Sequence, residues 1–259
     1  MKQARFILKY ICHFFSAYHT KGFGVHSPFI FQFLNNVIYE RNKFYVFDEI
    51  EKIRIELLQN KQTIFVKDFG TGSDRNRKVS EIARKSLKSP KYGQLLFRII
   101  QNVCPENILE LGTSLGITTA YLAANSSKSK CITLEGSPEI IKIARDNFEK
   151  LGCKNIEIIE GDINQTLELA LNKLQTIDFA FIDANHSSQA VLHYFQQCLP
   201  FASSNTVMVF DDIYWSDDME FAWKSIKNHP KVTSTIDLFQ LGIVFFNPDL
   251  NKKHYKMYY

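Results

Sequence analysis

The sequence predicts an α/β fold with a mostly parallel sheet, an antiparallel last strand and a helical extension at the N-terminus. Three observations support this. From about residue 92 onward, apolar runs alternate regularly with helical stretches. The runs are rich in β-branched and aromatic residues, as buried parallel strands are. The last two runs are separated by only four residues. Because a parallel crossover needs about a dozen residues or more, this pair is expected to be an antiparallel hairpin.

The periodicity predicts seven strands. Five of them alternate with helices, at residues 107–111, 130–135, 156–160, 177–183 and 206–211. The helices are expected at residues 118–125, 138–151, 165–173, 187–198 and 217–228. The two remaining strands, residues 232–237 and 242–246, form the hairpin at the edge of the sheet.

The first 90 residues differ from the rest of the chain. They are rich in aromatic residues and mostly helical in period, and a turn at His26-Ser27-Pro28 interrupts them. We therefore expect a helical extension at residues 1–90 and a sheet-containing domain at residues 91–259.

Composition narrows the function classes. A net charge of +4 and a pI near 8.7 are too mild to indicate nucleic-acid binding. The five cysteines are odd in number, widely spaced and without a Cys-x-x-Cys pair, so neither disulfides nor a zinc site is expected. They are expected to be small core residues in a cytoplasmic protein. No apolar run reaches the ~20 residues of a membrane span.

Residues 1–19 form a basic amphipathic helix in projection. Lys2, Arg5, Lys9 and His13 fall near one face. Such a helix can make weak contact with a membrane surface. Packing against its own domain is the preferred interpretation, and neither a signal peptide nor a membrane span is expected here.

Two glycine-rich turns follow apolar runs. In ILELGTSLG (residues 108–116) a buried run ends at Leu111, and Gly112 and Gly116 let the backbone turn tightly beside a ligand. A helix follows with its free N–H groups, and the next strand ends in Glu135, 19 residues after Gly116. This order of elements predicts a site for a ribose-containing cofactor: a strand, a glycine turn, a helix and a second strand that ends in an acid.

The other turn, VKDFGTGS (residues 66–73), lacks this context. A strand at residues 63–66 precedes it, and a polar helix with no further acid-tipped strand follows. We interpret it as a loop of the extension. Arg75 and Arg77 can reach an anionic ligand there, but a solvated loop is preferred.

The spacing of the glycines in this turn distinguishes between possible cofactors. The pattern is E-x-G-x-x-x-G, and Ser114 stands where a nicotinamide fingerprint has its second glycine. Glu110 adds a carboxylate that repels pyrophosphate and suits a cation. S-adenosylmethionine, which carries a sulfonium and an ammonium but no phosphate, fits this pattern.

The stretches ELGTSLGITTAYLA, TLEGSP and EGD (residues 160–162) resemble class I S-adenosylmethionine-dependent methyltransferases, whose sheet is Rossmann-like. SPKYGQLLFRIIQNVCPENILELGTSLG and AFIDANHSSQA resemble the catechol and caffeoyl-CoA O-methyltransferase group and its bacterial relatives, and the likeness covers residues 89–246. The resemblance implies that Glu110, Gly112 and Gly116 surround the methionine portion, that Glu135 holds the ribose and that Asp162 holds the adenine amino group. The other residues expected to bind the cofactor are Thr113, Ser114, Thr118, Gly136 and Asp183.

Three carboxylates end two strands that this fold makes neighbours. Asp183 ends one strand, and Asp211 and Asp212 end the next. Adjacent strands lie about 4.8 Å apart, and ligands bind at their carboxyl ends. Because three close anions raise one another's pKa, a hard divalent cation, Mg²⁺ or Ca²⁺, is expected between them.

The resemblance also assigns the chemistry. The resembling enzymes bind Mg²⁺ through Asp, Asp and Asn, and here the third position is Asp212. They carry a lysine base three residues after the first aspartate, where this chain has His186. His186 and Asp183 are therefore the expected catalytic residues, with His186 either the base or a residue that only orients the acceptor.

The expected activity is O-methylation of a small hydroxylated molecule with metal assistance. Three alternatives stay open: a metal-independent methyltransferase with His186 as base, a nicotinamide-dependent oxidoreductase, and a non-catalytic binding protein. A nucleic-acid substrate is not expected, because Asp183-Ala184-Asn185-His186 stands where base-modifying enzymes often carry an Asn/Asp-Pro-Pro-aromatic motif. The extension serves as an acceptor lid or a homodimer contact, and Tyr214 and Trp215 either wall the acceptor pocket or belong to the core.

Overall fold

The computed structural model describes residues 2–67, 69 and 73–259, with side chains from residue 5 onward. The chain divides into two compact units. Unit 1 combines Met1–Glu40 with Thr176–Tyr259, and unit 2 is Arg41–Gln175. The boundary expected near residue 90 stays a prediction, and each unit is described by itself.

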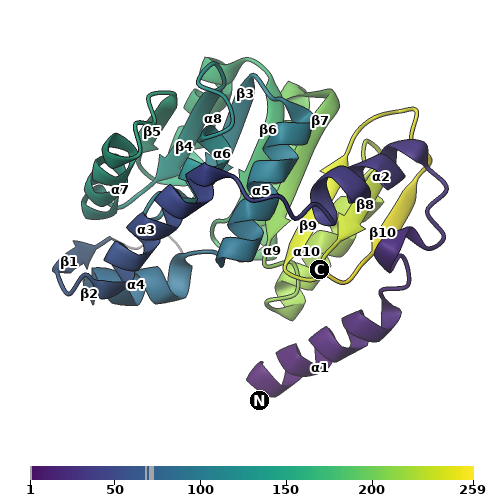
Figure 1. Cartoon of the computed structure of the whole chain (residues 1–259), viewed down its shortest axis with the longest axis horizontal. Helices are drawn as coiled ribbons and strands as arrows, with labels where there is room; N and C mark the ends of the chain where they lie inside the picture. The colour runs from purple at the N-terminus through teal and green to yellow at the C-terminus, as the bar shows by residue number, and fades with distance from the viewer. Residues whose placement is uncertain (1, 68, 70–72) are drawn as a thin grey trace. The chain divides into compact units, whose positions relative to one another are not determined.

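Unit 2 is built on three parallel strands with helices α6, α7 and α8 around them (Figure 1). The strands are β3 (Asn107–Leu111), β4 (Lys130–Glu135) and β5 (Ile156–Glu160), as the sequence predicted. The helices are α6 (Ile117–Ala123), α7 (Pro138–Lys150) and α8 (Ile163–Leu174). In register, Leu111 lies opposite Leu134 and Glu135 opposite Glu160, so the ends of the three strands meet at one edge.

The remainder of unit 2 precedes these strands. It consists of α3 (Tyr45–Gln59), β1 (Thr63–Val66), β2 (Arg75–Lys78), α4 (Val79–Ser86) and α5 (Pro90–Val103). The expected strand at residues 63–66 is present as β1. The sequence predicts a polar helix directly after the first glycine turn. The predicted start of this helix is wrong, because residues 75–78 pair with β1 as an antiparallel strand. Because most of its residues are charged, this short strand shows no apolar pattern by which the sequence could indicate it. Residues 68 and 70–72 of that glycine turn lie outside the described residues.

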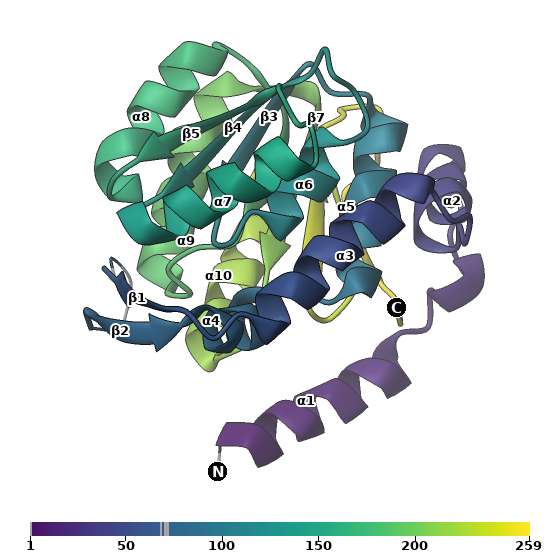
Figure 2. The same ribbon diagram turned by 60° about the vertical axis from the view of Figure 1, so that its left-hand side comes forward.

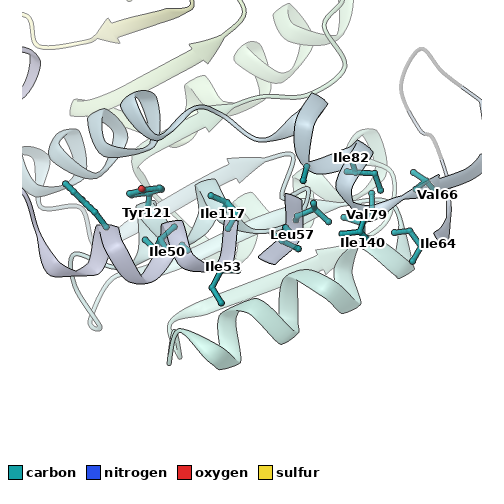
Figure 3. Packing of buried hydrophobic residues seen from close by; sticks show 14 of the residues in the cluster. Ile50, Ile53, Leu57, Ile64, Val66, Val79, Ile82, Ile117, Tyr121 and Ile140 are labelled. Carbon is teal, nitrogen blue, oxygen red and sulfur yellow. The ribbon is translucent and has the colours of Figure 1, made fainter. Parts of the chain in front are cut away.

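Side chains from six helices and strands, α3, β1, α4, α5, α6 and α7, form the core of unit 2 (Figure 3). Ile50 and Leu57 of α3, Ile82 of α4, Tyr121 of α6 and Ile140 of α7 all belong to it. Figure 2 shows α3 running beside α4 and α6, and the contacts between these helices agree. Burying large aliphatic and aromatic side chains in this way stabilises the fold by about 1.5–3 kcal/mol for each.

Unit 1 holds five strands in the order β10-β8-β9-β7-β6. They are β6 (Ile177–Ile182), β7 (Ala202–Asp211), β8 (Ser234–Asp237), β9 (Leu241–Phe245) and β10 (Lys253–Lys256). As predicted, β8 and β9 form a hairpin, and β9 runs antiparallel to both β7 and β8. Helices α9 (Ser188–Cys198) and α10 (Asp217–Asn228) accompany them, with the 3-10 turn η3 (Leu199–Phe201) between α9 and β7.

The strand count differs from the prediction. Apart from the β1–β2 pair, the described residues place three strands in unit 2 and five in unit 1, and the strand beyond the predicted seven is β10, which pairs in parallel with β8. The hairpin is therefore not at the edge of the sheet. In KHYK only Tyr255 is buried, and one buried residue in four produces no recognisable period.

The N-terminal part of unit 1 is helical. It contains α1 (Lys2–Ser16), η1 (Thr20–Gly22), α2 (Pro28–Phe33) and η2 (Leu34–Ile38). The basic face of α1 packs on its own unit. Arg5 and Lys9 pair with Asp217 at 2.6 and 2.8 Å, while Phe15 on another face is 80% exposed. The expected packing is confirmed, and membrane contact stays a prediction.

A buried carboxylate joins α1 to the strands of unit 1. His13 Nε2 lies 2.9 Å from Asp237 Oδ1, and Asp237 Oδ2 accepts hydrogen bonds from Tyr214 at 2.7 Å and Trp223 at 3.2 Å. Burial favours the neutral acid, but the His13 contact and the other donors outweigh it and lower the pKa of Asp237 below its ordinary value. Asp237 is thus an ionised acceptor for side chains from three elements.

Two further findings concern the length of the helices and the cysteines. Within the described residues, none of the helices combines the length and apolar character that a membrane span requires. All five cysteines are free thiols, and Cys131 and Cys198 are buried as expected, whereas Cys12 and Cys104 are exposed.

Removing the buried carboxylate tests this network. We expect Asp237→Ala to lower the free energy of unfolding by about 3 kcal/mol, because it leaves buried donors unpaired. Urea titration followed by circular dichroism measures the change. Asp249→Ala, at an exposed position, is the matched control and should stay within about 0.5 kcal/mol of the wild type. Equal effects of the two variants would contradict the role given to Asp237.

Candidate functional site

The turn between β3 and α6 has an unusual backbone. Gly112, Ser114 and Gly116 have φ values of 100°, 47° and 82°, a region that favours glycine. The Gly112 N–H donates to the Leu134 carbonyl at 3.1 Å, which folds the turn onto the end of β4. A Cβ atom on Gly116 would lie 2.6 Å from the Phe148 ring, so packing as well as conformation requires glycine there.

The carboxylate of Glu135 holds this turn. Its Oε2 accepts the Ser114 N–H at 2.9 Å, and its Oε1 accepts the N–H groups of Gly136 and Ser137 at 2.9 and 3.0 Å. Burial raises the pKa of Glu135, and the three backbone donors counteract part of that rise. Glu135 therefore lies at the glycine turn, as predicted, and hydrogen bonds hold its carboxylate in one orientation. Its contact with a ribose stays a prediction.

Glu110 is a second acid beneath the turn, with no exposed surface. Its Oε2 accepts hydrogen bonds from Thr119 at 2.5 Å and Thr133 at 2.7 Å. Its Oε1 has no hydrogen-bond partner among the residues that the structure describes. Burial raises the pKa of Glu110 to about 8, and the charge of Glu135 adds to the rise. A cation beside Oε1 would favour the ionised form.

The hydroxyl residues of the turn differ in their environments. Thr113 Oγ1 lies 2.6 Å from Thr133 Oγ1. Ser114 Oγ is buried without a hydrogen-bond partner in the described part of the chain, and Thr118 is buried in the first turn of α6. Sequence reasoning missed Thr119 and Thr133, although a threonine inside the buried run KCITLE was a signal of a polar partner below the turn.

Asp162 lies at the start of α8 and caps it. Its Oδ1 accepts the Asn164 N–H at 2.9 Å, as an N-cap residue does. The Gly161 N–H donates to the Glu135 carbonyl at 2.9 Å, so the residues after β5 lie beside the end of β4. Asp162 is therefore close to Glu135. Its contact with adenine stays a prediction.

The fit of these residues to a ligand can be judged from their donors. The Ser114 N–H, which would face a phosphate, is already donated to Glu135. Two acids, Glu110 and Glu135, face the turn, and Glu110 Oε1 and Ser114 Oγ are buried acceptors without partners among the described residues. This set fits a cationic ligand with hydroxyl groups and does not fit a pyrophosphate.

The remaining predicted site residues belong to unit 1. His186 Nε2 lies 3.8 Å from Asp183 Oδ1, in the loop between β6 and α9. Asp211 is buried at the end of β7, and Asp212 follows it with a φ of 51°. Among the described residues, no group of three or more His, Cys, Asp or Glu side chains is placed to hold a metal ion. The Mg²⁺ site expected at Asp183, Asp211 and Asp212 is therefore not confirmed and stays a prediction.

Unit 1 also contains a cleft of about 640 Å³. Phe6 and Ile7 of α1 line it together with Tyr214 and Trp215 of the loop after β7. Tyr214 stacks on Phe239 and Trp215 is 62% exposed. Tyr214 is therefore packed in the unit and also lines the cleft, and the use of this cleft as an acceptor pocket stays a prediction. The volume is in the usual range of small-molecule sites.

Comparison with known proteins adds to this geometry. The sequence model of a family described as a methyltransferase domain matches residues 109–213. This segment of the chain therefore resembles a methyltransferase domain. The match covers the glycine turn, Glu135, Asp162, Asp183, His186 and Asp211–Asp212, and the resemblance to class I methyltransferases is confirmed.

Two relatives are similar to part of the chain. A catechol O-methyltransferase of Niastella koreensis is 31% identical over 128 residues, which are 48% of this chain and 57% of that protein. A protein-L-isoaspartate O-methyltransferase of Pyrococcus horikoshii is 28% identical over 119 residues, 43% of this chain and 51% of that protein. The matched segment thus spans about half of each relative.

A solved structure resembles more of the chain. It is an O-methyltransferase from Bacillus cereus in complex with SAH (S-adenosylhomocysteine), 22% identical, with a TM-score of 0.57 over 83% of this chain and 96% of that one. At this identity the likeness shows the fold. The predicted Rossmann-like α/β class is therefore confirmed for this chain.

The pKa of Glu110 makes stability depend on pH. The unfolded chain loses this proton near the ordinary value of 4.5, whereas the folded protein keeps it to about 8. The contribution of Glu110 to the free energy of unfolding is therefore fully present below pH 4.5. It is lost as the pH rises to about 8, at up to about 1.4 kcal/mol per pH unit. Urea titrations at a series of pH values should show a flatter profile for Glu110→Gln. Glu139→Gln, at an exposed position, should keep the wild-type slope; a wild-type slope in Glu110→Gln would contradict the buried proton.

Proposed function

We propose that this protein is an S-adenosylmethionine-dependent methyltransferase that transfers the methyl group to an oxygen of a small hydroxylated acceptor. The single observation that carries the proposal is the pair of acids at the glycine turn, of which Glu110 is buried and Glu135 half-buried. Glu135 is fixed by three backbone N–H groups, and Glu110 keeps one oxygen without a partner among the described residues. The matched domain at residues 109–213 supports the same activity.

The donor's charge agrees with these acids. S-adenosylmethionine, when bound, supplies a methyl group on a cationic sulfur. Glu110 would face its positive charge, and Glu135 would accept hydrogen bonds from the ribose hydroxyls. A nicotinamide dinucleotide would instead place a pyrophosphate at a turn whose Ser114 N–H is already used. The oxidoreductase alternative is therefore disfavoured.

The small acceptor is inferred from the cleft in unit 1. Its aromatic and aliphatic lining from Phe6, Ile7, Tyr214 and Trp215 suits a planar or apolar body. A volume of about 640 Å³ suits a small molecule, in line with the catechol that the Niastella koreensis relative is named for, better than a protein chain.

His186 is the base in this proposal. His186 would accept the proton of the acceptor hydroxyl through Nδ1, because Nε2 is the nitrogen that faces Asp183, and this leaves an oxygen nucleophile in place of a neutral alcohol. Asp183 Oδ1, 3.8 Å from His186 Nε2, would orient the imidazole. No step of this proposal is assigned to a metal ion.

Ligand-induced stabilisation tests the donor. At about 100 times its Kd, S-adenosylhomocysteine should stabilise the folded protein by about 2.7 kcal/mol, and NAD should not. Glu135→Ala should lose most of this stabilisation, because it removes the acceptor for the ribose. Glu160→Ala is the matched control, since Glu160 is exposed and lies opposite Glu135 in the register. Stabilisation by NAD alone would contradict the proposal.

Substitution of His186 and chelation test the base. His186→Asn should lower kcat by about 10²–10⁴-fold, the usual contribution of a general base. His193→Asn, at an exposed position on α9, should have wild-type kcat. Turnover of a catechol probe should persist in EDTA. Turnover that is abolished by EDTA and restored by Mg²⁺ would contradict His186 as the sufficient base and support metal assistance.

A further inference from the structure

The chain just after β1 contacts the end of β4 within unit 2. β1 ends at Val66, and the N–H of Lys67 donates to Ser137 Oγ at 3.4 Å. Ser137 is also one of the residues whose N–H binds Glu135. The start of the first glycine-rich stretch therefore lies beside the acid of the second.

The ring of Phe69 lies against Gly136. A Cβ atom on Gly136 would be 2.2 Å from Phe69 Cδ2 and 2.7 Å from Cε2. Real Cβ atoms do not come so close, so the ring fills the space that any other side chain at position 136 would take. The Lys67 ammonium lies 4.7 Å from the ring centroid, a cation–π distance. Phe69 is thus positioned by two neighbours rather than by the core, and 37% of its surface is exposed.

Gly136 directly follows the acid that the proposed function assigns to the ribose. Because Gly136 has no side chain, the apolar surface next to Glu135 is supplied by Phe69 from a distant part of the chain. A nucleoside bound through its ribose at Glu135 has its base within reach of this surface. Aromatic side chains bind bases by stacking, at about 1–3 kcal/mol for each base.

We propose that Phe69 is a binding residue for the nucleoside half of the methyl donor, an inference that depends on the proposed function. The stretch VKDFGTGS would then contribute an aromatic ring to the donor site rather than a phosphate-binding loop. Only Lys67 and Phe69 of the stretch take part in the inference, since both are described and both contact the β4–α7 connection.

Calorimetric titration of the full chain with S-adenosylhomocysteine and with adenosine tests this inference. Phe69→Ala should weaken both ligands by the same factor, about tenfold, because the lost contact is with the part that they share. Phe69→Tyr should bind both as the wild type does. Phe65→Ala is the matched control, because Phe65 lies on β1 and is 53% exposed; it should leave both affinities unchanged. Unliganded melting temperatures of the variants show whether the hairpin has been disturbed.

The outcomes separate this inference from the proposed function. If the wild type binds S-adenosylhomocysteine and Phe69→Ala binds it equally well or more tightly, the role of Phe69 is overturned and the proposed function stands. A loss confined to S-adenosylhomocysteine, or an equal loss in Phe65→Ala, also overturns the nucleoside contact. No binding by the wild type, with a normal melting transition, would overturn the proposed function itself.

Discussion

The geometry of the candidate donor site depends on the hydrogen bonds that Glu135 accepts from three backbone N–H groups. One carboxylate binds both the turn after β3 and the turn after β4, which hold Ser114 and Gly136. The left-handed conformation of Ser114 has a conformational cost that this contact offsets. The same three amides counteract the burial that raises the pKa of Glu135. A single acid therefore shapes the turn and presents charge to it.

Glu110 shows how a buried acid can be held for a charged ligand. Two threonine hydroxyls satisfy one of its oxygens, and burial keeps the group protonated up to about pH 8. A neutral acid is less costly to bury than an anion. In the proposed function, the arrival of a cation would reverse this balance and release the proton, so the cost of ionisation is met only when the donor is bound.

Unit 1 uses the same principle for structure. Asp237 is buried, yet its pKa is lowered, because His13, Tyr214 and the Phe239 N–H contact its oxygens. The basic face of α1 thereby becomes its packed face, and Tyr214, which lines the cleft, is held by the same carboxylate. Tyr214 is at once a partner of Asp237 and a wall of the cleft, which links the stability of the unit to the shape of the proposed acceptor site.

The sequence by itself determined the order and bounds of β3, β4 and β5, the turn at Gly112–Gly116 and the acid at Glu135. These features depend on local periodicity, on positive φ values that favour glycine, and on a fixed strand–turn–helix–strand order. Only the tertiary structure decided that β10 extends the strands of unit 1, that Thr119 and Thr133 bind Glu110, and that Phe69 fills the space above Gly136. Each of these contacts joins residues whose relation depends on packing and side-chain direction, and spacing along the chain carries no information about either.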